Sequence, residues 1–344
     1  MSADFTLSVL DNAFTGHGIT AQESLAEVVA LARTAEERGY QRFWMSEHHG
    51  MPGAATSSPQ MMLARLTGET STIRLGAGGV MLPNHAPLLV AEQFGMLDAL
   101  APGRIDLGLG RAPGTDHATA MALRRHHEAN DHFPQQVEEL VGFLGDDFPA
   151  GHPYAAVHAV PGPWQAAENG VAPAAGPELW ILGSSPHSAQ LAAQLGRPYA
   201  FALQFGGADV LGAMKIYRDN FQPSRHLAEP HTLLSVSTVA HDDPQEARRQ
   251  ARSGAMAMLR MFQRKPFSLL TPDQVDAYRA SPQEQEVIAS YTANTLHGTG
   301  AQVGEGIERL NEQVQADEVM LVVTGHSRQV LRRTLELVAD HFGM

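Results

Sequence analysis

The sequence predicts a (β/α)8 TIM barrel of the α/β class, with insertions, and three observations favour this fold. Short apolar runs alternate with segments of helical periodicity along the chain. Eight such runs, each followed by a helical segment, match the strand count of this barrel. The residues after the first run carry no glycine-rich dinucleotide fingerprint, which disfavours a doubly wound sheet, the alternative fold. We therefore expect one domain over residues 1–344.

The apolar runs give the predicted strands, and the periodic segments between them give the helices. The expected strands are Leu7–Leu10, Arg42–Ser46, Ile73–Met81, Arg104–Leu109, Glu178–Leu182, Tyr199–Leu203, Leu233–Ala240 and Glu318–Val323. The expected helices are Gln22–Arg38, Pro59–Glu69, Pro87–Leu100, Pro134–Leu144, His187–Leu195, Ala208–Asn220, Pro244–Phe262 and Ser327–His341. The first helix has the clearest boundaries, because Thr20 and Glu23 form a capping-box pattern before it and Gly39 follows its apolar stripe.

Two connections are too long for ordinary loops. Residues 145–176 are rich in Pro, Gly and Ala, which indicates an irregular insertion. Residues 264–306 are polar, with helical fragments at Thr271–Arg279 and Pro282–Thr292. We expect the second insertion to act as a lid over a binding site.

Composition excludes several classes of protein. The 24 Lys and Arg residues against 37 Asp and Glu residues give a net charge of −13, without a basic cluster that would bind nucleic acid or a membrane surface. Cysteine is absent, which excludes disulfides, thiolate metal sites and iron–sulfur clusters. No targeting or membrane-spanning segment is evident, so we expect a cytoplasmic protein.

Candidate functional residues cluster where the predicted strands end, as they do in barrel enzymes. After the fifth strand, Gly183, Ser184, Ser185 and Ser188 surround the start of a helix, where hydroxyls and free backbone N–H groups can bind phosphate. An ordinary helix cap is the alternative. Arg111, after the fourth strand, can pair with the same phosphate; the alternative is a surface ion pair.

Glycines and histidines mark two other strand ends. Gly78 and Gly79 indicate a bulge or the close approach of a flat ligand ring, with tight internal packing as the alternative. His48 and His49 suit acid–base catalysis, although any given one of the 17 histidines is more often structural than catalytic. Adjacent histidines on a strand cannot converge on one ion, and we predict no metal site. The remaining histidine cluster is interpreted as lid or solvated surface: His117, His126, His127 and His132.

Several segments of the sequence resemble the bacterial luciferase-like, flavin-dependent monooxygenase family. The resemblance is dense in the first half of the chain and thin in the second. Its matching segments are Tyr40–His49, Ile73–Pro87, Ala91–Phe94 with Leu97–Asp98, Pro102–Arg111, and Gly183–Ser185 with Ser188.

The resemblance implies a barrel that binds FMN at the carboxyl ends of its strands. By position, Arg111 would contact the FMN phosphate, with Gly183, Ser184, Ser185 and Ser188 completing the phosphate site. Gly78 and Gly79 would form a non-proline cis peptide beneath the isoalloxazine ring. His48 would be the catalytic proton relay, and Glu47 would orient it or a neighbouring backbone group.

The resemblance also implies the chemistry. Reduced FMN would react with O2 to give a flavin 4a-hydroperoxide, which oxygenates a small organic substrate. Since no second nucleotide signature is present, we expect a separate flavin reductase as partner. Gly110 stands where luciferases carry a reactive cysteine, so we expect no luminescence. Two alternatives remain: a deazaflavin-dependent hydride-transfer oxidoreductase, disfavoured by the Glu47-His48-His49 strand end, and a non-catalytic flavin-binding protein.

Further expectations concern assembly and the substrate. Relatives pair through the helices after the second and third strands, so we expect a homodimer, although the same side chains can pack against the barrel instead. The apolar candidates are Met61, Met62, Leu63, Leu66, Leu88, Leu89, Phe94, Met96 and Leu97. The residues expected to shape the substrate site, besides the lid, are Asp11, Phe14, His17, Met81 and Gln204.

Overall fold

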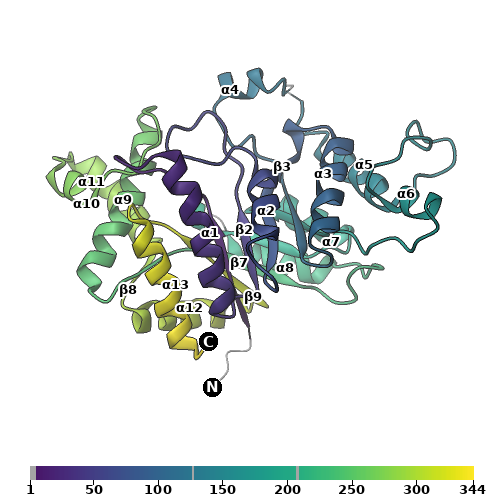
Figure 1. Cartoon of the computed structure of the whole chain (residues 1–344). Helices are drawn as coiled ribbons and strands as arrows, with labels where there is room; N and C mark the ends of the chain where they lie inside the picture. Colours follow the sequence, from purple (N-terminus) through teal and green to yellow (C-terminus); the bar gives the residue numbers. More distant parts are fainter. Residues whose placement is uncertain (1–4, 126–127, 207–208) are drawn as a thin grey trace.

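A computed structural model of the chain describes residues 5–125, 128–206 and 209–344, and it shows a closed parallel barrel (Figure 1). Eight strands pair in the order β1-β2-β3-β4-β5-β6-β7-β9, and β9 pairs with both β7 and β1 to close the barrel. The predicted (β/α)8 TIM barrel is therefore confirmed. The first and last helices lie side by side across the closure (Figure 1).

Eight of the nine described strands fall close to their predicted positions, and β8 was not predicted. Their bounds are β1 Thr6–Asp11, β2 Arg42–Met45, β3 Arg74–Met81, β4 Ile105–Gly110, β5 Glu178–Gly183, β6 Tyr199–Ala202, β7 Thr232–Ala240, β8 Leu296–Gly298 and β9 Glu318–Val323. The described helices are α1 Ala21–Glu37, α2 Pro59–Thr67, α3 Pro87–Leu100, α4 His117–Ala122, α5 Phe133–Gly145, α6 Pro163–Glu168, α7 Pro186–Gln194, α8 Val210–Asn220, α9 Pro244–Phe262, α10 Pro272–Ala277, α11 Pro282–Ala293, α12 Gly300–Val314 and α13 Arg328–Phe342. Ala208, the first residue of one predicted helix, lies outside the described residues.

The chain between α9 and β9 holds more regular structure than the sequence patterns predicted. The predicted helical fragments correspond to α10 and α11, which pack against α9. Beyond them, β8 pairs in parallel with β7 outside the barrel. Helix α12 follows, with Thr299 and Gln302 forming its capping box. The predicted insertion boundary at residue 306 therefore falls inside α12.

Apolar packing occupies two layers. One side of each strand packs under the surrounding helices, as Val9, Phe43 and Leu75 do. The other side fills the barrel interior with a smaller cluster around Trp44 and Trp180, whose rings meet edge to face at 5.4 Å. Burial on both sides explains why the strands appear in the sequence as nearly continuous apolar runs.

An ion-pair network closes the barrel at the amino ends of its strands. Arg42, only 6% exposed, donates to Asp106 at 3.0 Å, to Glu178 at 2.9 Å and to Glu318 at 3.0 Å. Its guanidinium also lies 4.7 Å from the centre of the Trp180 ring. We call these four charged residues the floor network. It satisfies charges that would be costly to bury singly, and it leaves the carboxyl ends of the strands for a site.

Across the described ranges, no helix is both long enough and apolar enough to cross a membrane.

Candidate active site

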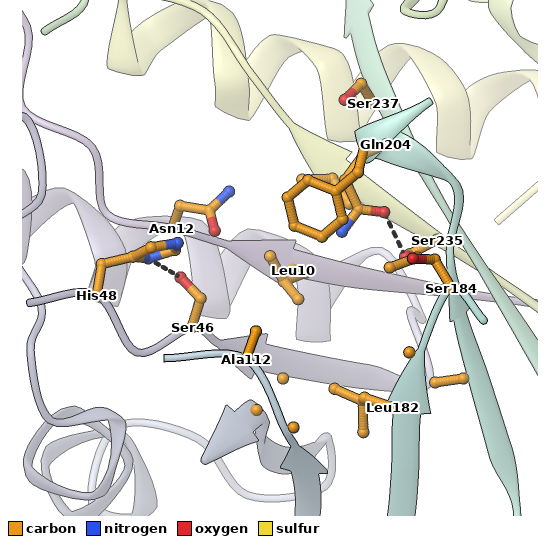
Figure 2. Close-up of a pocket in the computed structure, with 18 of the residues that line it drawn as sticks. Leu10, Asn12, Ser46, His48, Ala112, Leu182, Ser184, Gln204, Ser235 and Ser237 are labelled. Carbon is orange, nitrogen blue, oxygen red and sulfur yellow. Dashed lines mark hydrogen bonds between the residues drawn. The ribbon is translucent and has the colours of Figure 1, made fainter. Parts of the chain in front are cut away.

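A cavity of about 600 Å³ opens at the carboxyl ends of the barrel strands. Its wall includes the ends of β2, β3, β5, β6, β7 and β9, together with residues from the loop after β4 and from α9. Figure 2 shows Asn12, His48 and Ser46 on one side of this space and Ser184, Gln204 and Ser235 on the other. Of the predicted site residues, all but Glu47 line it: His48, Gly78, Gly79, Arg111, Gly183, Ser184, Ser185 and Ser188.

The segment after β5 both caps helix α7 and lines the cavity. Ser185 is the N-cap of α7, and its hydroxyl oxygen accepts a hydrogen bond from the backbone N–H of Ser188. The Ser188 hydroxyl donates back to the Ser185 carbonyl over 2.8 Å. Ser184 forms no side-chain hydrogen bond within the described part of the chain, and its hydroxyl lines the cavity. Ser185 and Ser188 therefore form the helix cap and line the cavity, whereas Ser184 lines the cavity without taking part in the cap.

Arg111 is held by its backbone, while its exposed side chain lines the cavity. Arg125 donates to the Arg111 carbonyl over 2.7 Å and to the side-chain oxygen of Asn84 over 2.7 Å. Within residues 5–125, 128–206 and 209–344, the Arg111 guanidinium forms no ion pair, unlike the surface pair considered as its alternative. An arginine side chain without an ion-pair partner is suited to an anionic ligand.

The Gly78–Gly79 peptide is cis, as the resemblance implied. A Cβ at Gly78 would lie 2.7 Å from Leu10 Cδ1 and 2.7 Å from Trp44 Cε3, and one at Gly79 would lie 2.7 Å from the Gly108 carbonyl oxygen. Packing within the barrel thus requires both glycines. They also line the cavity, so the wall is flat and free of side chains at this point.

His48 faces the cavity at the end of β2. Its Nδ1 lies 3.1 Å from the Ser46 hydroxyl, and its ring centre is 5.9 Å from that of Phe14. Burial lowers the pKa of His48 to about 4, against the weaker opposing effect of the Glu47 carboxylate. The imidazole is therefore neutral at neutral pH, with one ring nitrogen able to accept a proton.

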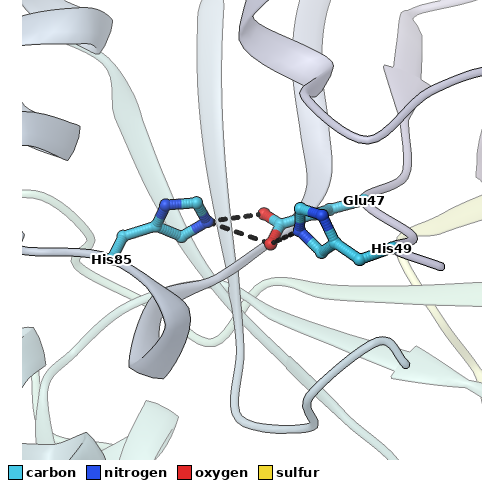
Figure 3. Close-up of side chains that lie close together, drawn as sticks. All are labelled: Glu47, His49 and His85. Carbon is cyan, nitrogen blue, oxygen red and sulfur yellow. Dashed lines mark hydrogen bonds and ion pairs between the residues drawn. The ribbon is translucent and has the colours of Figure 1, made fainter. Parts of the chain in front are cut away.

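Glu47 does not contact His48, and its carboxylate instead holds a separate cluster (Figure 3). It accepts hydrogen bonds from His49 Nε2 at 2.9 Å, His85 Nε2 at 2.9 Å, Asn84 Nδ2 at 3.1 Å and the Met81 backbone N–H at 3.1 Å. Burial alone would raise the pKa of Glu47, but the hydrogen bonds from His49 and His85 outweigh it and lower the pKa to about 2. Glu47 thus contacts a neighbouring backbone group, the second of its two expected roles.

The ligand-type atoms of Glu47, His49 and His85 lie within 4.8 Å of one another, a grouping that resembles a metal site. Two observations explain the grouping without an ion. Both imidazoles hydrogen-bond the carboxylate directly, and the Asn84 amide and Met81 N–H point donors at the same oxygens. We interpret the cluster as a buried anion satisfied by neutral and imidazole donors.

The expected substrate-shaping residues divide into two groups. Phe14, Met81 and Gln204 line the cavity. Asp11 and His17 do not: Asp11 forms a buried ion pair with Arg328 at 2.6 Å, and His17 is tied by its backbone N–H to the Leu269 carbonyl. His117 and His132 are absent from the described lining, and His126 and His127 lie outside the described residues.

Sequence reasoning did not identify several residues that line the cavity. The segment between α9 and α12 contributes Phe267, Leu269, Tyr291 and Thr295, and β7 contributes Ser235 and Ser237. The first four lie within the region expected to be a lid, but no motif marks them individually. For Ser235 and Ser237 a signal was available, because side chains two residues apart on a strand point to the same side.

Known proteins resemble this chain over almost its whole length. Residues 6–318 match a family model described as luciferase-like monooxygenase. The chain is 40% identical over 334 residues to a luciferase-like monooxygenase of Escherichia coli K12, covering 97% of this chain and 96% of that protein. It is 35% identical over 336 residues to the N-acetyl-S-alkylcysteine monooxygenase of Bacillus subtilis, covering 97% of both chains. The crystal structure of apo-MsnO8 superposes with a TM-score of 0.84 at 33% identity, covering 98% of each chain.

Proposed function

The chain belongs to the luciferase-like monooxygenase family, a family of oxidoreductases, and from this premise we propose that it uses reduced FMN and O2 to oxygenate a small organic substrate. One observation carries the proposal. Arg111 and Ser184 follow different strands, yet both line one cavity with the side-chain-free wall at Gly78 and Gly79. That combination suits a ligand with a phosphate at one end and a flat ring at the other.

The donors present fit this cofactor. The Arg111 guanidinium, the Ser184 hydroxyl and backbone N–H groups that follow Pro186 at the start of α7 would bind the phosphate, and Gly78 with Gly79 would lie along the ring. When bound, reduced FMN would supply the electrons that activate O2. His48, neutral and facing the same cavity, would accept or return a proton during oxygenation. Apolar side chains of the α9–α12 segment would exclude water.

Binding measurements separate this proposal from its alternatives. Equilibrium dialysis and flavin fluorescence should show tight binding of FMN, weaker binding of riboflavin, which lacks the phosphate, and weaker binding of a deazaflavin cofactor. A preference for the deazaflavin would instead favour hydride transfer. Reoxidation of bound reduced FMN by O2 should then be measured in wild type and His48→Ala protein, with and without each candidate substrate. If none of the substrates changes the reoxidation kinetics, the storage alternative is favoured.

We also propose a separate reductase, because the sequence carries no second nucleotide-binding signature besides the residues assigned to FMN. The isolated protein should not oxidise NADH or NADPH, and addition of a flavin reductase should restore turnover. Rapid NADH oxidation by the protein alone would contradict this.

A homodimer through α2 and α3 is proposed from the exposure of their side chains. Leu63, Leu66, Phe94 and Leu97 are buried against the barrel, so these four candidates do not need a partner. Met61 is 74% exposed, Leu89 48%, Met96 57% and Leu100 60%, which leaves an apolar face on the same two helices. Such a face is typical of a subunit contact.

A further inference from the structure

Arg111 is the single side chain with a permanent charge among the described residues that line the cavity. No lysine, aspartate or glutamate of the described ranges takes part in that lining. Two charged groups buried elsewhere are paired: Asp11 with Arg328, and Arg42 with the carboxylates of the floor network. The cavity therefore offers one cationic group, and the proposed function assigns that group to the FMN phosphate.

The remaining polar groups of the cavity are uncharged. Apart from the serines assigned to the phosphate and His48, they are the side chains of Asn12, Ser46, Asn130, Gln204, Ser235, Ser237, Tyr291, Thr295 and Thr324. Ser235 and Gln204 hydrogen-bond to each other at 2.7 Å, which fixes one end of the Gln204 amide and leaves the other end for a ligand (Figure 2). His48 adds a neutral imidazole at neutral pH. These groups can orient a carbonyl, hydroxyl or amide, but they cannot neutralise an ion.

Apolar side chains make up the wall beside His48. Phe14 and Phe267 lie with ring centres 4.7 Å apart, and Phe267 and Leu269 are almost completely buried, which holds this wall in place. Tyr291 continues the wall outward and lies 5.9 Å from Phe262, a residue that is 65% exposed. Phe205, which is 61% exposed, also lines the cavity. Aromatic and aliphatic side chains thus line much of the cavity, alongside the polar Asn12 and Ser46 next to His48 (Figure 2).

From these observations we propose that the cavity selects an uncharged, largely apolar substrate carrying a neutral hydrogen-bonding group, and rejects carboxylates and ammonium ions. The inference rests on the proposed function, because it requires FMN to occupy Arg111. A carboxylate or an ammonium ion that entered beside bound FMN would lose its hydration without gaining a partner of opposite charge. An amide or alcohol of the same shape would keep its hydrogen bonds through Gln204 or the hydroxyls of β7.

Three probes with one phenylalkyl skeleton test the proposal: 4-phenylbutanamide, 4-phenylbutanoate and protonated 4-phenylbutylamine. Calorimetric titration of the FMN-loaded protein at pH 7.5 should show the amide binding at least about tenfold more tightly than either ion, a difference of about 1.4 kcal/mol. Equal binding of the carboxylate and the amide would overturn the proposal. Failure of the amide to bind would overturn it as well, because the proposal requires the uncharged probe to be held.

A charge introduced into the wall should reverse the selection. In Ser237→Lys protein, the carboxylate should bind at least about tenfold more tightly than in wild type, because the new ammonium group supplies its partner. Ser237→Met is the matched control, with similar length and no charge, and it should leave the order of the three probes unchanged. Retained FMN affinity in both variants shows that they fold. A carboxylate affinity that rises equally in both variants would contradict the electrostatic explanation.

A final arm separates this inference from the proposed function. Arg111→Ala protein titrated without FMN contains no permanent charge in the described cavity lining. It should still prefer the amide to both ions. If FMN fails to bind wild type protein, the proposed function fails; if this variant binds the ions as well as the amide, the charge-selection inference fails.

Discussion

Glu47 and His48 are consecutive in the chain, yet their side chains have separate partners: the carboxylate of Glu47 lies buried among His49, Asn84, His85 and the Met81 backbone, whereas the imidazole of His48 faces the cavity. After β2, one side chain of the pair therefore satisfies a buried cluster and the other lines the cavity. Substitutions at the two positions should have different consequences.

Glu47→Gln should destabilise the fold by about 3 kcal/mol. The glutamine amide replaces one carboxylate oxygen by an NH2 group, which would face the donors of Met81 and Asn84, and it removes the negative charge that these donors satisfy. Urea unfolding at pH 7.5 measures the change. Glu312→Gln, at an exposed position of α12, is the control and should differ from wild type by less than about 0.5 kcal/mol. A near-neutral effect of Glu47→Gln would contradict the role assigned to this carboxylate.

The stability of the protein should fall as the pH is lowered from 6.5 to 4. In this interval the unfolded chain protonates His48, whose ordinary pKa is near 6.5, whereas the folded protein, with a pKa of about 4, does not. His48→Gln should remove this contribution, so the loss between pH 7.5 and 5 should be smaller in the variant. Glu47, with a pKa of about 2, acts at lower pH, as the pH falls from 4.5 to 2. Parallel urea-unfolding results for wild type and His48→Gln would show that His48 is not held neutral by burial.

Ser185→Ala and Ser184→Ala should separate helix capping from ligand binding. Loss of the N-cap of α7 should cost about 1 kcal/mol and lower the melting temperature. Ser184→Ala should leave the melting temperature unchanged and weaken FMN binding, since its hydroxyl lines the cavity outside the capping hydrogen bonds. Thermal unfolding and FMN titration of both variants give the two readouts. The reverse pattern would assign the phosphate contact to Ser185.

Arg111→Ala should weaken FMN binding by about 10- to 100-fold, the effect of losing a charge-assisted hydrogen bond to phosphate. Riboflavin, without the phosphate, should bind wild type and variant equally. The control is Arg309→Ala on the outer helix α12, where the arginine side chain is 65% exposed. Equal losses for FMN and riboflavin would indicate a general disturbance of the cavity.

Met96→Glu should dissociate the proposed dimer, because a charge on the exposed face of α3 cannot be buried against its copy. Light scattering at micromolar concentration should change from a dimer mass to a monomer mass. Met121→Glu places the same charge at another exposed methionine, on α4, and should leave the mass unchanged. A wild type protein that is already monomeric at this concentration would refute the interface.

The sequence predicted the barrel well because its strands are buried on both sides, and this condition leaves a local signal in residues such as Trp44 and Val80. Strand β8 has three residues, Leu-His-Gly, and forms through its pairing with β7, so no local pattern indicates it. Helix α12 carried usable signals in Thr299 and in its buried Val303 and Ile307, which the polar composition of the region obscured.

The candidate site was predictable to a similar extent and for a similar reason. Strand-end residues such as Arg111 and Ser184 can be placed from local order alone, since parallel strands end at one edge. The contacts of Glu47 cannot, because His85 and Asn84 come from the turn after β3 and meet it only in the folded barrel. Contacts across strands depend on register, which the residue pattern of one segment does not specify.

The floor network closes the barrel at the amino ends of its strands. Because Arg42 and its carboxylate partners occupy the amino ends of the strands, the cavity lies at the opposite, carboxyl ends, and a ligand held there is approached from that side.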